Sequence, residues 1–166
     1  MNNRNKMLLE AVTEVVGDPL MAKRVAFAVA KMEAADGKGD SYETVKDLAM
    51  WLLGESNALN VAHWNVDKMA KHTLLQEAYD LCRDTGDKLA ETYIAITGKA
   101  IKGTVPEGSE IDVDDESVIK CLENLQTRIQ EAVSKNDKFS EGLKNIFADF
   151  DENITTIIYK YRQFVS

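Results

Sequence analysis

Residues that interrupt helices are scarce in this chain, which has 2 prolines and 9 glycines among 166 residues. Both residue types are common in the turns of β proteins, so their scarcity argues against an all-β fold and favours long helices. The sequence also lacks any run of about 18 uninterrupted apolar residues, and we therefore expect no transmembrane helix. The first residues, MNNRNKMLLEAV, lack the apolar core and cleavage site of a signal peptide. These absences predict a cytoplasmic protein without membrane partners.

Basic residues and cysteines are also few. The chain has 20 basic and 28 acidic residues, a formal charge of −8, and its N-terminal arm offers only Arg4 and Lys6. Binding to nucleic acid phosphates requires a dense basic surface, so we do not expect nucleic acid as a partner. The two cysteines, Cys82 and Cys121, have no Cys-x-x-Cys spacing and are expected to be reduced, buried thiols.

The residues that are present describe an all-α protein. Apolar residues make up 45% and charged residues 29%, as in globular domains. Apolar positions recur every three or four residues in four segments, which predicts helices over residues 40–66, 70–98, 114–134 and 137–164. The predicted core stripes are Val45, Leu48, Leu52, Ser56, Leu59, His63 and Val66; Leu75, Ala78, Cys82, Thr85, Leu89, Tyr93 and Ile96; Val118, Leu122, Leu125, Ile129 and Ala132; and Phe139, Leu143, Ile146, Phe150, Ile154, Ile157, Tyr161 and Phe164.

Four amphipathic helices predict a four-helix bundle, and the lengths of their connections predict its topology. The first and second helices, and the third and fourth, are joined by short turns, whereas residues 99–113 have no helical periodicity and can span the bundle. Short, long and short connections are typical of the ferritin-like fold, with a long crossover between the second and third helices. Residues 1–38 are expected to form an N-terminal helical appendage, with short helices at residues 6–16 and 19–35, before a bundle at residues 39–166.

The only two histidines lie where the first two helices meet. His63 is near the end of the first helix and His72 is near the start of the second. One histidine on an apolar stripe is commonly a hydrogen-bonded core residue, whereas two together with carboxylates indicate a metal site. Both interpretations stay open on these residues alone.

Polar residues form a strip beside the core stripe of the second helix. Counting 100° per residue from Leu75, His72 lies at about 60°, Gln76 at about 100°, Asp87 at about 120° and Glu91 at about 160°. His72 and Asp87 are about 22 Å apart along the axis, so one chain cannot bring them to one ion. Antiparallel packing against a second copy would bring them together. The alternative is an ordinary solvated face.

These residues resemble the signature of the Dps-type miniferritins. The resemblance rests on the sequence AHWNV at residues 62–66, the following His72, and Asp87-x-x-x-Glu91. It implies a homo-oligomer of dimers, in that family a hollow dodecamer. It also implies that Fe(II) binds at the dimer interface, is oxidised by peroxide or dioxygen and is stored as ferric mineral. The implied ligands of Fe, or of Mn or Zn, are His63 and His72 of one subunit and Asp87 and Glu91 of the other. Trp64 would be the aromatic neighbour of the site.

The alternative function is a ferritin-like structural or assembly protein with a degenerate metal site. Gln76 stands where the family usually has aspartate, and the two histidines are 9 residues apart here, three fewer than in the family. The six acids Glu107, Glu110, Asp112, Asp114, Asp115 and Glu116 either line a cation pore or form a solvated connector, with Asp114 capping the third helix. No phosphate-binding glycine loop or nucleophile elbow is present, so any enzyme activity would be that of the metal site.

Overall fold

The computed structural model describes residues 39–164. The chain divides into two units, Met1–Asp40 and Ser41–Ser166, and the account below concerns the second. The two short helices expected at residues 6–16 and 19–35 lie outside the described residues.

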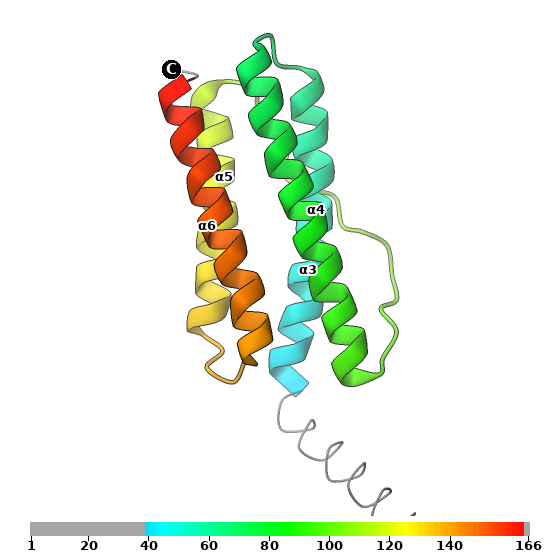
Figure 1. Cartoon of the computed structure of the whole chain (residues 1–166). Helices are drawn as coiled ribbons and strands as arrows, with labels where there is room; N and C mark the ends of the chain where they lie inside the picture. Colours follow the sequence, from blue (N-terminus) through cyan, green and yellow to red (C-terminus); the bar gives the residue numbers. More distant parts are fainter. Residues whose placement is uncertain (1–38, 165–166) are drawn as a thin grey trace, which may run out of the picture. The chain divides into compact units, whose positions relative to one another are not determined.

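The described unit is a bundle of four helices, labelled as in Figure 1, and residues 39–164 contain no strand. The helices are α3 (Gly39–Trp64), α4 (Met69–Thr97), α5 (Asp115–Ser134) and α6 (Glu141–Phe164). The prediction of an all-α bundle is therefore confirmed, with each long helix where its apolar stripe lies.

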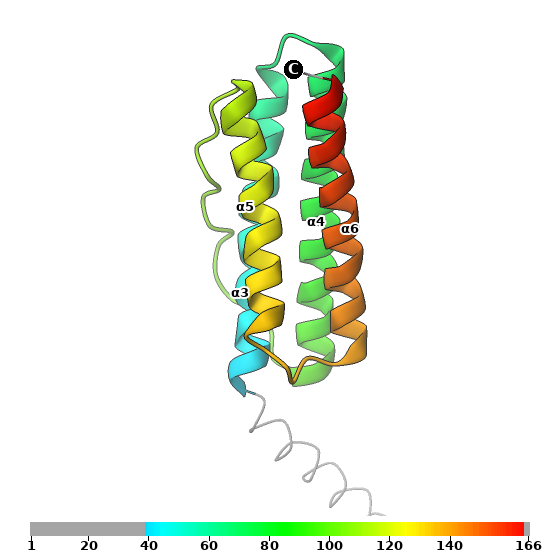
Figure 2. The ribbon, with the colours of Figure 1, turned by 90° about the vertical axis from the view of Figure 1, so that its left-hand side faces the viewer.

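The segment between α4 and α5 runs back along the bundle beside α3, so that α4 and α5 point in the same direction (Figures 1 and 2). Two hydrogen bonds attach this connector to α3: the Ser109 hydroxyl donates to Glu55 Oε1 at 2.8 Å, and the Ser109 N–H donates to Glu55 Oε2 at 3.3 Å. Glycines allow this close approach, because a Cβ atom added to Gly54 would lie 2.7 Å from the Pro106 carbonyl oxygen.

The core contains almost all of the predicted stripe residues, including Ser56 and Thr85. Ile96 is an exception. It is 40% exposed, because the last turn of α4 extends beyond Tyr93, the last buried residue of that helix. Phe147 and Ile158 are core residues of α6 that the predicted stripe omitted. They lie on the edges of the stripe, where neighbouring helices decide burial.

Helix ends follow local capping chemistry. The Asp114 carboxylate accepts from the Ser117 N–H at 3.0 Å, which confirms the predicted cap of α5. The last helix begins at Glu141 and not at Asp137, because the Ser140 hydroxyl accepts from the Leu143 N–H at 3.3 Å. The first long helix ends at Trp64, two residues before its predicted end.

A partly buried ion pair joins the start of α4 to the start of α5. Lys71 Nζ lies 2.5 Å from a carboxylate oxygen of Asp115, and the Tyr161 hydroxyl of α6 lies 3.5 Å from the same oxygen. Burial, together with the negative charge of Asp115, raises the pKa of Tyr161. Three helices are therefore connected by polar contacts at this end of the bundle.

None of the four described helices combines the length and apolarity that crossing a membrane requires.

We expect Gly108→Ala to loosen the connector. The added Cβ would lie 2.7 Å from Ala58 Cβ and closer still to the Gly54 backbone, so the free energy of unfolding should fall by about 1–3 kcal/mol. Gly142→Ala is the matched control, since nothing lies closer than 3.9 Å to its Cβ and the change should stabilise α6 by about 0.4–1 kcal/mol. Urea unfolding of both variants measures the difference, and equal effects would contradict the close approach.

Candidate functional site at the α3–α4 turn

The turn between α3 and α4 brings the two histidines into contact. Residues 65–68 connect the helices, with the Asn65 N–H donating to the Ala62 carbonyl at 3.0 Å and the His72 N–H donating to the Lys68 carbonyl at 3.0 Å. The ring centroids of His63 and His72 are 3.6 Å apart, with 56° between the ring planes. The proximity expected from sequence is therefore present within one chain.

His63 is an unusual buried residue. Its side chain is 7% exposed, and among the described residues neither ring nitrogen has a hydrogen-bond partner. An unsatisfied buried polar group costs about 1–3 kcal/mol, so each such group in a folded protein needs an explanation. A bound metal ion could be the partner of one of the two nitrogens, the one with the lone pair. His72 is half-buried, so its ring reaches solvent.

Electrostatics keep His63 neutral. Burial lowers the pKa of His63, the neighbouring His72 lowers it further, and Asp80 partly opposes these effects. A neutral imidazole has a nitrogen lone pair available, which is the form that binds metal ions.

Four residues around the histidines were not recognised as part of the site in the sequence. The Tyr79 ring meets His63 edge-on with centroids 5.4 Å apart, and the Tyr79 carbonyl accepts from the Ser56 hydroxyl at 2.8 Å. The Arg83 guanidinium lies 6.0 Å from the Tyr79 ring centroid and forms an ion pair with Asp80 at 2.5 Å. Because Tyr79 lies seven residues after His72, two helical turns, this spacing is the signal that would have identified it.

The other predicted site residues are on the surface. Asp87, Glu91 and Gln76 are exposed on α4, and Trp64 is 67% exposed at the end of α3. α4 is continuous from Met69 to Thr97, so the rise of 1.5 Å per residue separates His72 from Asp87 by about 22 Å. Within residues 39–164, no group of three or more His, Cys, Asp or Glu side chains is placed to hold a metal ion. Within one chain, His63 and His72 therefore lie in contact, and Asp87 and Glu91 lie too far along α4 to reach them.

The cysteines lie inside the bundle and away from this chemistry. Both are free thiols; Cys82 is fully buried and Cys121 half-buried. Burial raises the pKa of Cys82, and raises the pKa of Cys121 to about 12. Thiols of this kind are unreactive at neutral pH. The expectation of a buried thiol holds for Cys82, whereas Cys121 is only half-buried.

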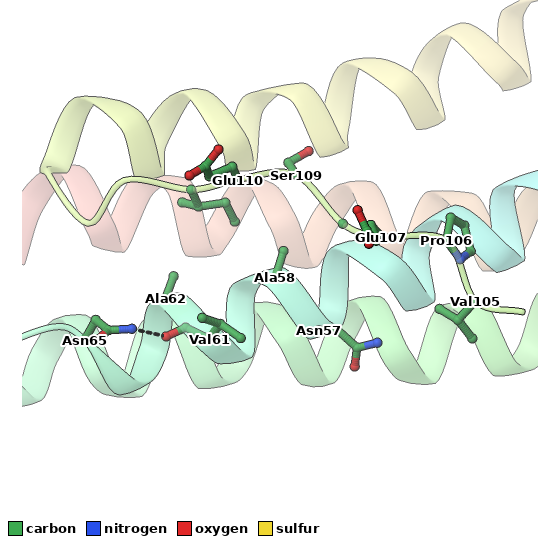
Figure 3. A pocket seen from close by; sticks show the side chains of 12 residues that line it. Asn57, Ala58, Val61, Ala62, Asn65, Val105, Pro106, Glu107, Ser109 and Glu110 are labelled. Atoms are coloured by element: carbon green, nitrogen blue, oxygen red, sulfur yellow. Dashed lines mark hydrogen bonds between the residues drawn. The ribbon is translucent and has the colours of Figure 1, made fainter.

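A shallow hollow of about 590 Å³ lies between α3 and the connector (Figure 3). Asn57 and Val61 of α3 line one side, and Val105, Glu107 and Glu110 of the connector line the other. It contains two of the six acids noted in the connector. His63 does not line this hollow, and its ring contacts Tyr79 of α4 instead.

Comparison with known proteins places the chain in a family. Residues 63–161, more than half of the chain, match the model of a family of unknown function, DUF5856, and the chain belongs to that family. The matched range begins at His63 and includes His72, Gln76, Asp87 and Glu91. No curated protein and no solved structure matches the chain.

The lowered pKa of His63 predicts a pH-dependent stability. In the unfolded chain the imidazole titrates near its ordinary pKa of 6.5, so below that pH the unfolded state binds a proton that the folded state excludes. The free energy of unfolding should therefore fall as pH drops from about 7.5 to about 5.5. Urea titrations at several pH values measure the slope. His63→Gln should flatten it, and an unchanged slope in that variant would contradict the assignment.

Proposed function

We propose that this chain is an iron-binding protein of the Dps-like miniferritin type, in which His63 and His72 of one copy bind Fe(II) together with Asp87 and Glu91 of a second copy. The observation that carries the proposal is the buried pair of His63 ring nitrogens without a partner, in contact with the second histidine. A metal ion would bind the lone pair of one of these nitrogens, and the other would keep its proton.

The donor set suits iron. Imidazole nitrogens and carboxylate oxygens are ligands of Fe(II), and also of Mn(II) and Zn(II). The carboxylates of Asp87 and Glu91 would give the ligand set a charge of −2. This charge favours Fe(III), the product of oxidation, over Fe(II), the substrate. The match between the negative ligands and the more highly charged ion supports oxidation of iron at this site.

The connectivity of the bundle is consistent with this class. Short turns join α3 to α4 and α5 to α6, and the long connector lies along the bundle between α4 and α5 (Figure 2). This order of short, long and short connections is the ferritin-like one. It supports the proposed class independently of the histidines.

The proposed reaction is the oxidation of Fe(II). Each Fe(II) ion loses one electron, and one hydrogen peroxide molecule takes up two electrons and two protons to give two water molecules; dioxygen is the alternative oxidant. Ferric mineral would then be stored inside a hollow assembly of dimers. The chain's own residues supply the ligands, and burial of His63 keeps its ring neutral and ready to bind.

Complementation between two inactive variants tests the shared site. His72→Ala and Glu91→Gln should each lower the affinity for Fe(II), measured by anaerobic calorimetry, by tenfold or more, whereas Glu152→Gln on α6 is a control that should have no effect. Mixing the two variants should restore about a quarter of the wild-type sites. Half of the randomly formed dimers contain both chains, and each of these has one intact site.

Two results would contradict the proposal. Absence of Fe(II), Mn(II) and Zn(II) binding by the wild-type chain would remove the metal site altogether. Loss of binding in both variants without restoration on mixing would show that the histidines and the carboxylates do not share a site across two copies.

A second candidate function is a structural or assembly protein that retains this fold without metal chemistry. Gln76 favours it, because a neutral amide oxygen is a poorer iron ligand than the carboxylate usual in the miniferritins. Metal binding by the wild-type chain decides between the two functions.

A further inference from the structure

Ser109 is the residue through which the connector makes its polar attachment to α3. Its hydroxyl and its N–H donate to the two carboxylate oxygens of Glu55, at 2.8 Å and 3.3 Å. Glu55 is only 3% exposed, whereas Ser109 is an exposed residue in a segment without helix or strand. No other backbone N–H between residues 100 and 113 has a hydrogen-bond partner among the described residues. The polar attachment of this segment therefore depends on Ser109 and Glu55.

Acidic residues lie at fixed positions after this serine. In the sequence SEID, Glu110 is the next residue after Ser109 and Asp112 is the third. No other serine or threonine of the chain has acidic residues at both of these positions. Both carboxylates are exposed on the connector, and neither forms an ion pair within residues 39–164. Protein kinases select substrates partly by such charge patterns, so this segment fits an enzyme with a basic substrate groove.

A phosphoryl group on Ser109 would be incompatible with the attachment to α3. It carries a charge of about −1.5 to −2 at neutral pH and accepts hydrogen bonds, whereas the hydroxyl that it replaces donates one. Glu55 would therefore lose a donor and face a second negative group at a buried position. The backbone cannot shift toward α3 to compensate, because even a Cβ atom at Gly108 would lie 2.2 Å from the Gly54 carbonyl oxygen.

We propose that Ser109 is a phosphorylation site for an acid-directed serine kinase, and that phosphorylation releases the connector from α3. In the transfer, the Ser109 Oγ forms a bond to the γ-phosphorus of ATP, and the bond from that phosphorus to the oxygen of the leaving ADP breaks. The hydroxyl proton passes to the catalytic aspartate of the kinase, and ADP leaves with the electron pair. The inference is independent of the proposed metal site, since it uses the opposite side of α3 and none of the histidines.

Phosphorylation of the full chain tests the site. Incubation with ATP and an acid-directed kinase of the casein kinase type should add one phosphate, which mass spectrometry should locate on Ser109. The double variant Glu110→Gln/Asp112→Asn should be phosphorylated at least tenfold more slowly, because the basic groove of the kinase loses its charge partners. Asp149→Asn/Glu152→Gln removes two exposed acids from α6 and is the matched control, which should behave as wild type. No phosphate, or phosphate on another residue, would overturn the proposal.

Hydrogen–deuterium exchange of residues 103–113 tests the release of the connector. The phosphorylated protein and the variant Ser109→Glu should exchange about tenfold faster than wild type, because the connector loses a hydrogen bond to a charged group. Ser109→Gln has the same size without the charge, and its amide can donate to Glu55, so its exchange should be slower than that of Ser109→Glu. Adding Glu55→Gln to Ser109→Glu should restore most of the protection, because it removes the repulsion. Unchanged exchange after phosphorylation, equal exchange in Ser109→Glu and Ser109→Gln, or no restoration by Glu55→Gln would overturn the release.

Discussion

The connector between α4 and α5 is the constraint on which the arrangement of this bundle depends. It must return along the whole bundle, and it can lie there only because Gly54 and Gly108 lack side chains and because the buried Glu55 carboxylate holds Ser109. With the connector attached to α3, α5 starts at the same end of the bundle as α4. That common end is where the Lys71–Asp115 pair and the Tyr161 hydroxyl meet.

The histidine pair lies at the same end and combines two kinds of environment. His63 is enclosed by the bundle and kept neutral by burial, whereas His72 reaches the surface of the α3–α4 hairpin. His72 is thus the member of the pair on the solvent side of the hairpin, where the proposed second copy would contribute its carboxylates. The interior of the bundle contributes packing and unreactive thiols, and it offers no comparable polar group without a partner among the described residues.

The proposed interface and the proposed metal site place opposite demands on the same helix. Carboxylates that bind an ion repel each other in its absence, and an interface made only of such groups would depend on metal. Gln76 bears on both candidate functions, because its neutral amide is a poorer iron ligand than a carboxylate and adds no negative charge to the surface of α4.

The sequence by itself determined the four helices, most of their buried faces and the cap of α5, because periodicity of three and four residues and capping by Asp114 are local properties. It also indicated that His63 and His72 would meet, because only a short turn separates them. Burial of Phe147, Ile158 and Glu55, and the edge contact of Tyr79 with His63, were decided by the tertiary structure. These features depend on which helix or connector lies opposite each residue, and distant segments of the chain supply those neighbours.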